Sequence, residues 1–171
     1  MRKTTIGLTF LVAWLLAVPT VWAQKDEAKE HAELAKAMKD AKVSLEKGLS
    51  VSTHEGKPIS AKYEMEDGKL QLSVYAMKGD KFSEVIVDHT TGQVAKAEPI
   101  TGGDDLTHAK AQSEAMAKAT RSLNAAIADA VKVNKGFRAV SVMPTVKDGH
   151  PIAGISLVKG TEWKSVSAKL D

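Results

Sequence analysis

The chain has 171 residues with 24 basic and 21 acidic side chains and no cysteine, so an exported form would be held together by burial without disulfides. Residues 24–171 lack Arg2 and Lys3 and therefore carry 22 basic and 21 acidic side chains, a net charge of 22 − 21 = +1. This balance argues against nucleic acid or an anionic membrane as a partner. The five aromatic side chains in that range are also too few for platforms that stack bases or sugars.

The N-terminal segment has the three parts of a secretory signal peptide. A basic start is followed by an apolar run from Thr4 to Val18, and small residues close the segment at Ala23. The pattern predicts a signal peptide over residues 1–23, cleaved between Ala23 and Gln24. An uncleaved anchor is the alternative, because the longer run from Thr4 to Trp22 is just about long enough to span a bilayer. We favour cleavage, and we expect an exported protein, periplasmic or secreted, with no stable membrane anchor afterwards.

Comparing the chain with itself reveals two similar helical patterns. At an offset of 78 residues, the apolar and small residues of 37–49 align with those of 115–127. In both segments the apolar positions step by three or four, which gathers them on one face of a helix. The pattern predicts one amphipathic helix over residues 37–49 and another over 115–127.

The strand signals repeat as well, at an offset of 81 residues. Alternating apolar residues run up to Asp67-Gly68 and away from it, and Asp148-Gly149 holds the matching place in the second copy. Such turns between alternating runs mark tight hairpins. Each copy therefore predicts a three-stranded antiparallel meander, and only the first continues, through residues 88–92, into a fourth short strand.

These patterns predict an α+β fold of two tandem units, each with one amphipathic helix covering one face of a three- to four-stranded meander. The first unit spans residues 24–100 and the second, degenerate unit spans 106–171. The glycines and acids of residues 101–105 indicate a linker. Within it, Asp105 is a candidate cap for the second helix.

Residues 41–97 resemble a PepSY domain. The resemblance rests on the helix that ends near Leu49, on the meander KPISAKYEMEDGKLQLSVYAMKGDKFSEVIVD, and on the motif D-x-x-T-G-x-V that contains Asp88, Thr91 and Gly92. Residues 115–171 are similar only in outline, since they lack this motif. The resemblance implies an exported, non-catalytic α+β module of a family proposed to bind and restrain peptidases.

The motif itself first suggests a protease loop of the D-T-G type. Here, however, two residues separate Asp88 from Thr91-Gly92, and the sequence holds one such loop where the aspartic mechanism needs two carboxylates. A turn is the better interpretation, with Asp88 accepting backbone N–H groups and Gly92 supplying a positive φ.

Other catalytic and metal-binding patterns are weak. The five histidines have no zinc-type spacing, and the weak surface cluster of His31 with Glu27 and Glu30 fits a solvated helix face. The methionines after Met1 could suggest copper(I), but Met38, Met65 and Met116 occupy predicted core positions. The sequence has no cysteine nucleophile and no G-x-S-x-G motif. We therefore predict no catalytic residue, no metal site and no cofactor.

The leading hypothesis is an exported, non-enzymatic binding module whose partner is another envelope or secreted protein, with peptidases as one candidate class. An open strand edge near residues 162–170 offers one way to bind a peptide, although Lys164 and Lys169 favour protection of that edge. The alternative function is a periplasmic protein that handles a small ligand or a metal in a pocket between the two units. A hydrolase is a third class, and no motif supports it.

Overall fold

The structure is a computed structural model that describes residues 21–171, with side chains from residue 28 onward. Residues 1–20 of the expected signal peptide lie outside the described residues. The expected cleavage site, Ala23-Gln24, falls in the first helix, where side chains are not described. None of the helices in the described part has both the length and the apolar character needed to cross a membrane.

Four α-helices, one short 3-10 helix and seven strands make up the described chain, which confirms the predicted α+β class. In chain order they are α1 (Val21–Ala37), α2 (Leu45–Val51), η1 (Ser52–His54), β1 (Lys57–Glu66), β2 (Lys69–Lys78), β3 (Lys81–Val87), β4 (Val94–Ile100), α3 (Gly103–Lys118), α4 (Leu123–Val133), β5 (Arg138–Lys147), β6 (His150–Lys159) and β7 (Glu162–Lys169).

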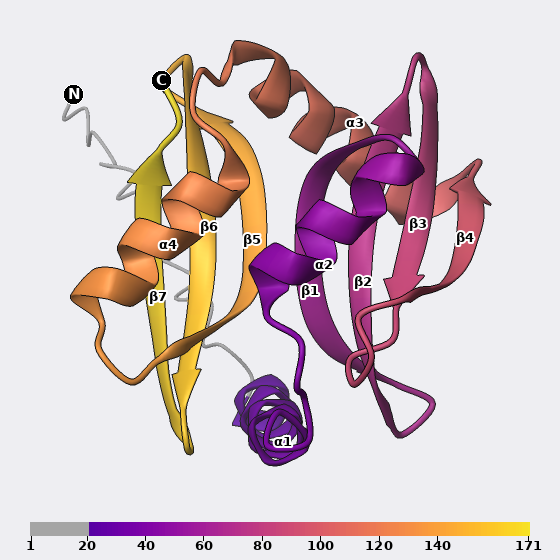
Figure 1. Ribbon diagram of the computed structural model, residues 1–171. Helices are drawn as coiled ribbons and strands as arrows, with labels where there is room; N and C mark the ends of the chain where they lie inside the picture. The colour runs from indigo at the N-terminus through magenta and orange to yellow at the C-terminus, as the bar shows by residue number, and fades with distance from the viewer. Residues whose placement is uncertain (1–20) are drawn as a thin grey trace, which may run out of the picture.

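All seven strands form one antiparallel sheet in the order β4-β3-β2-β1-β5-β6-β7. The two meanders meet where β1 pairs with β5, through Ala61 opposite Val142 and Lys62 opposite Ser141. This junction is much shorter than the ladders within each meander. The sheet is therefore continuous, and β4 and β7 form its two edges (Figure 1).

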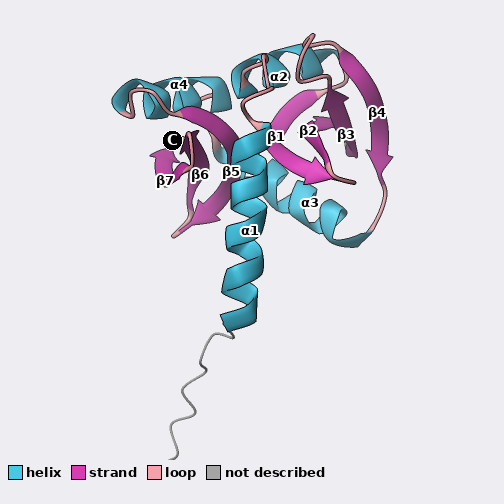
Figure 2. Cartoon of the chain, turned by 90° about the horizontal axis from the view of Figure 1, so that it is seen from below, coloured by secondary structure: helices cyan, strands magenta, loops and turns pink. Residues whose placement is uncertain are grey.

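Helices cover both faces of the sheet. On one face α2 packs on β1 and β2, while α4 packs on β5, β6 and β7 (Figure 1). On the opposite face α3 packs on β5, β6 and β1 (Figure 2). We expected one covered face for each meander, and the position of α3 on the opposite face was not predicted. Its Gln112 is buried and accepts a hydrogen bond of 2.7 Å from the Ser60 hydroxyl on β1.

The two predicted amphipathic helices, 37–49 and 115–127, are each broken in the structure, so these predictions were wrong. Between α1 and α2, the N–H groups of Lys42 and Val43 both bond to the carbonyl oxygen of His89. Between α3 and α4, Thr120 and Arg121 bond in the same way to Leu170. These N–H groups are thus satisfied by distant carbonyls instead of by the preceding helical turn.

New helices then begin at two serines. Ser44 has an extended backbone and its Oγ accepts the N–H of Lys47, which caps α2. Ser122 caps α4 through the N–H of Ala125. Serine is favoured at this position because its side chain satisfies an N–H that the first turn leaves open.

The predicted linker, residues 101–105, is partly helical. Helix α3 begins at Gly103, and its cap residue is Gly102, without a side-chain hydrogen bond. The expected cap, Asp105, was wrong: this residue lies inside the first turn and accepts a 2.6 Å hydrogen bond from the Tyr75 hydroxyl. A partner on β2 therefore holds the carboxylate that the sequence suggested for capping.

The same details recur in both halves of the sheet. A register shift lies between Pro58 and Ser60 in β1, and another lies between Ala139 and Ser141, at an offset of 81 residues. The hairpin residues Asp67 and Asp148, also 81 residues apart, both adopt a positive φ, of 49° and 52°. The register shifts and the hairpin turns thus occur at corresponding positions in the two halves.

Candidate functional site: a cleft between α2 and α4

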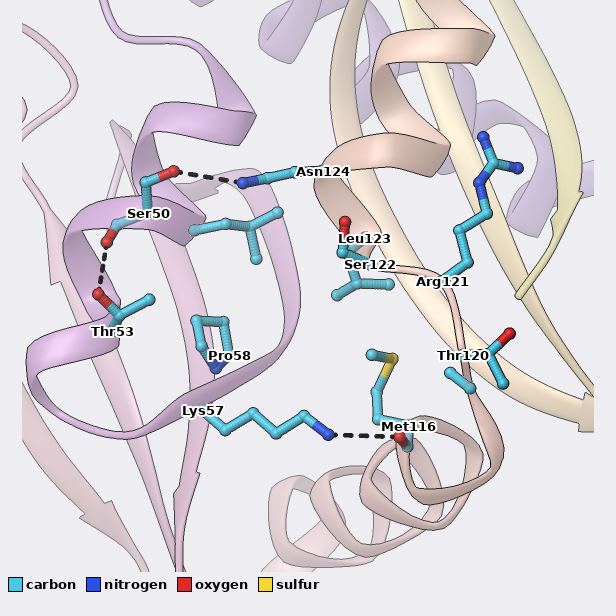
Figure 3. A pocket seen from close by; sticks show the side chains of 12 residues that line it. Ser50, Thr53, Lys57, Pro58, Met116, Thr120, Arg121, Ser122, Leu123 and Asn124 are labelled. Atoms are coloured by element: carbon cyan, nitrogen blue, oxygen red, sulfur yellow. Dashed lines mark hydrogen bonds between the residues drawn. The ribbon is translucent and has the colours of Figure 1, made fainter. Parts of the chain in front are cut away.

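A cleft of about 450 Å³ lies at the junction of the two halves, next to the end of α2 and the start of α4 (Figure 3). Its walls come from α2 and η1, the first residues of β1, the end of α3, the α3–α4 connection and the first turn of α4. The lining residues are Leu49, Ser50, Thr53, Lys57, Pro58, Met116, Ala119, Thr120, Arg121, Ser122, Leu123 and Asn124. Binding sites for small molecules commonly have a volume of several hundred cubic ångströms.

The breaks between the helices create this cleft. Because α3 ends at Lys118 and α4 begins at Leu123, the chain between them runs along the wall of the cleft. The bonds from Thr120 and Arg121 to the carbonyl oxygen of Leu170, at 2.7 and 2.9 Å, fix this connection to the end of the chain. A continuous helix through this region would not leave the same opening.

The inner wall is apolar. Leu49 of α2, Met116 of α3 and Leu123 of α4 are all buried, and Pro58 adds a half-buried ring at the start of β1. The three buried side chains belong to the hydrophobic core that continues beneath the cleft. An apolar group that enters the cleft would therefore rest on well-supported side chains.

Polar groups line the rim, and one hydrogen bond crosses it. Asn124 of α4 donates from Nδ2 to the Ser50 hydroxyl of α2 at 3.2 Å (Figure 3). The Oδ1 atom of Asn124 is buried and has no hydrogen-bond partner. A buried carbonyl in this state costs about 1–3 kcal/mol. One side-chain hydrogen bond thus links α2 and α4 across the rim.

Lys57 supplies the positive charge that faces the cleft. Its Nζ lies 3.4 Å from the carbonyl oxygen of Met116, a long hydrogen bond that leaves other N–H directions open (Figure 3). Arg121 also lines the cleft, but its guanidinium turns away to Asp129 and to the carbonyl oxygen of Ala125. The cleft thus combines an apolar floor with one available cation.

The lining residues lack the carboxylate, imidazole and thiol groups of common catalytic and metal sites. None of the twelve lining residues is a histidine, cysteine, aspartate or glutamate. Among the residues that the structure describes, no group of three or more His, Cys, Asp or Glu side chains is placed to hold a metal ion. What this cleft can do chemically is enclose an apolar group and pair an anionic group with Lys57.

A second hollow lies on the other face of the first meander and is acidic. Its lining includes Glu64, Glu84, Glu98 and Asp105, with Tyr75 at its base. Burial raises the pKa of the Glu64 carboxyl, and a hydrogen bond from Lys62 opposes this effect. Burial and the bond to Asp105 raise the pKa of the Tyr75 hydroxyl above its ordinary value. This tyrosine is thus a neutral hydrogen-bond donor under ordinary conditions.

The motif residues Asp88, Thr91 and Gly92 form the turn between β3 and β4 and do not line the cleft. Asp88 Oδ1 accepts the N–H groups of Thr90 and Thr91 at 2.8 and 2.7 Å, and Gly92 has a φ of 74°. These backbone bonds lower the pKa of the Asp88 carboxyl. Because the next carbonyl, of His89, holds the segment before α2, the turn positions that helix.

His31 and His150 each contact a different residue, at different places in the fold. His31 of α1 stacks on Trp163 of β7 with the ring centres 4.6 Å apart, and His150 lies 2.5 Å from the Asp171 carboxylate.

The residues that line the cleft were not predicted from the sequence as site residues, although several of them belong to the repeated pattern. Ser122 was a usable signal, since a serine ahead of an apolar helical run favours a helix start there.

Comparison of the chain with protein-family models, with curated proteins and with solved structures finds no match.

Proposed function

We propose that the chain is an exported, non-enzymatic binding protein built from two PepSY-like units, and that the cleft between α2 and α4 receives an apolar anchor of a partner protein. Envelope and secreted proteins are the expected partners, with peptidases as the first class to test. The observation that carries this proposal is the cleft itself, which has an apolar floor and no histidine, cysteine, aspartate or glutamate in its lining.

The recurrence of local geometry supports the two-unit arrangement. The capping serines, the register shifts and the bonds that hold the segments before α2 and α4 have the same places in both halves. Two units joined edge to edge leave a gap between their helices, because each helix is centred on its own meander. The gap between α2 and α4 is then a consequence of the duplication.

The chemistry of the cleft suggests what the anchor looks like. One or two aliphatic or aromatic side chains would fit against Leu49, Met116 and Leu123, and their burial would supply most of the affinity. A carboxylate beside the anchor would pair with Lys57 at the rim. The expected anchor is therefore an apolar residue next to an acidic group.

A small ligand is the second candidate, and the size of the cleft favours it. A volume of about 450 Å³ is within the range of sites for small molecules. A compact carboxylic acid with an apolar body would use the same floor and the same lysine. The two candidates differ in what occupies the cleft, so one set of variants tests both.

The test uses Thr53→Trp, which puts a large ring at the wall of the cleft. Thr53 is exposed and its hydroxyl bonds back to the Ser50 carbonyl oxygen at 2.8 Å. Thr107→Trp is the matched control, since Thr107 is an exposed helical threonine with a similar bond to Gly103 and does not line the cleft. Both variants should fold with little loss of stability.

The measurement is capture of envelope proteins by each immobilised variant, with a thermal-shift screen of aliphatic and aromatic carboxylic acids alongside. We expect the wild type and Thr107→Trp to retain the same partner and Thr53→Trp to lose it. Stabilisation by a carboxylic acid that Thr53→Trp abolishes, without a protein partner, would favour the small-ligand candidate. Equal capture by all three proteins would refute the role of the cleft.

A further inference from the structure

Among the described residues 21–171, β7 (Glu162–Lys169) pairs with β6 alone, whereas the corresponding strand of the first half has a partner on each side. In the first half, β4 pairs with β3 from Phe82 to Val87. At an offset of 81 residues, Phe82 corresponds to Trp163 and Val85 to Val166, so β7 corresponds to β3. The pairing of β4 with β3 thus shows that an antiparallel strand fits beside the corresponding edge.

The backbone groups that β7 presents outward can be identified from its pairing with β6. Leu170 donates its N–H to the Pro151 carbonyl oxygen at 2.9 Å, in register with the β6–β7 ladder. Because bonded and non-bonded pairs alternate in an antiparallel ladder, the even-numbered residues of β7 bond to β6. The N–H and C=O groups of Trp163, Ser165 and Ser167 therefore point away from the sheet.

The usual protections of an edge strand are weak here. β7 has no proline, no glycine and no register shift. Lys164 and Lys169 were the expected protecting residues. The Nζ of Lys164 turns toward α4, where it lies 3.1 Å from Asn134 Oδ1 and 4.9 Å from the centre of the Phe137 ring, and this leaves Lys169 at the end of the strand. The middle of the strand, residues 165–168, carries only small or aliphatic uncharged side chains.

The opposite edge makes the contrast clear. β4 contains Pro99, which has no N–H to donate, and an exposed ion pair between Lys96 and Glu98 at 2.7 Å. Both features discourage a further strand. β7 is therefore the edge of this sheet that remains suited to strand pairing.

The charges around β7 indicate the chemistry of the segment that would pair with it. Exposed lysines lie on β7, at the end of its partner β6, and at or just after the end of α4, which packs on β7: Lys132, Lys135, Lys159, Lys164 and Lys169. The acids are fewer, and one of them, Asp171, is held by His150. Val133, at 79% exposed, is an apolar side chain at the end of α4. An extended segment with acidic and aliphatic residues would complement this edge.

A second copy of the chain fits less well. Two β7 strands related by a two-fold axis would bring two sets of these lysines together, and facing like charges are unfavourable. We propose that β7 accepts an extended acidic segment of another protein as an eighth strand, held by the outward backbone groups of Trp163, Ser165 and Ser167. This surface is separate from the cleft, so the inference does not depend on the function proposed above.

The test uses two designed peptides with the same alternating Thr and Val core, flanked by glutamates in one and by lysines in the other. Ser167→Pro removes one outward N–H from the protein without breaking a bond to β6, whereas Ser167→Ala keeps that N–H and serves as the control. We expect saturable binding of the glutamate peptide to the wild type and to Ser167→Ala, weakened by added salt. Ser167→Pro should bind about tenfold more weakly.

Further arms cover the other outcomes. Lys169→Glu should weaken the glutamate peptide and strengthen the lysine peptide. If Ser167→Pro fails to fold, N-methylation of alternate residues of the glutamate peptide tests the same hydrogen bonds and should abolish binding. No saturable binding of the glutamate peptide, or equal binding of both peptides, would overturn the proposal. Dimerisation of the wild type that Ser167→Pro abolishes would instead assign the edge to a second copy and overturn the stated partner.

Discussion

Replacing Gly48 with alanine tests how closely the two halves of the fold correspond. Gly48 lies in the middle of α2, and a Cβ atom at this position would come within 2.7 Å of Leu72 Cδ2 on β2. Leu72 is fully buried, so its side chain has little room to move. The positions that correspond in the second half are Ala126 and Ala153, both fully buried, where a smaller strand residue leaves space for the helix methyl group.

The magnitude follows from two opposing terms. Alanine in a helix interior is favoured over glycine by about 1 kcal/mol, whereas overpacking of a dense core costs typically about 1–3 kcal/mol. We therefore expect Gly48→Ala to lower the free energy of unfolding by about 1 kcal/mol, or the melting temperature by about 2–4 °C. In the background of Leu72→Ala, which alone costs about 2–5 kcal/mol, the same change should instead stabilise the protein by about 1 kcal/mol.

The assay is chemical unfolding followed by circular dichroism for the wild type, the two single variants and the double variant. The sign of the Gly48→Ala effect should reverse between the two backgrounds, which corresponds to a coupling of about 2 kcal/mol, within the range seen for contacting residues. If Gly48→Ala stabilises the wild type, or changes both backgrounds equally, then Gly48 and Leu72 are not in close contact. In that case the comparison with Ala126 and Ala153 does not explain why position 48 is a glycine.

Three further predictions concern other parts of the fold. Burial raises the pKa of Tyr63 from 10.0 to about 12, against the opposing charge of Arg138. The folded form therefore keeps its proton at pH values where the unfolded form loses it, and the free energy of unfolding should fall between those two pH values. Ultraviolet titration should find no tyrosine ionising near pH 10 in the folded protein. The lowered pKa of Asp88 contributes stability at pH values above the ordinary pKa of 3.8, and this stability is lost as the pH falls through the folded value. At neutral pH, Asp88→Ala should therefore lower the melting temperature, and Asp88→Asn, which keeps an acceptor oxygen for the turn, should lower it less. Equal melting temperatures for the wild type and both variants would contradict this prediction. Arg138 bonds to the carbonyl oxygens of Met38 and Val43 at 2.9 and 3.3 Å, and Arg138→Met should cost about 1–3 kcal/mol in chemical unfolding, mostly through faster release of the segment before α2 in hydrogen exchange.

The strands could be predicted from the sequence because their signals are local. Asp67-Gly68 and Asp148-Gly149 adopt positive φ at all four residues, as a two-residue hairpin turn requires, and the alternation on either side fixed which residues enter the core. The contact between the two meanders was not predictable in this way. Alternation says which face a residue occupies, but it does not say that β1 and β5 lie side by side.

The helix breaks and the cleft depend on contacts between distant parts of the chain. Apolar spacing predicted helices over residues 37–49 and 115–127, and most of their apolar side chains are indeed buried. The backbone nevertheless leaves the helix because the carbonyl oxygens of His89 and Leu170 take the N–H groups ahead of Ser44 and Ser122. Since those acceptors lie at the ends of strands, only the assembled fold reveals the breaks, and the cleft that they open was missed with them.

The most direct test of the central claim is site-specific photo-crosslinking in the native envelope. A photoreactive amino acid at position 53 lies on the cleft wall, and the same amino acid at position 107 lies on α3 outside the cleft lining. We predict that position 53 gives a covalent adduct with a discrete protein, identified by mass spectrometry, and that position 107 does not. Adducts with the same proteins at both positions, or none at position 53, would contradict the account of the cleft as the site of partner binding.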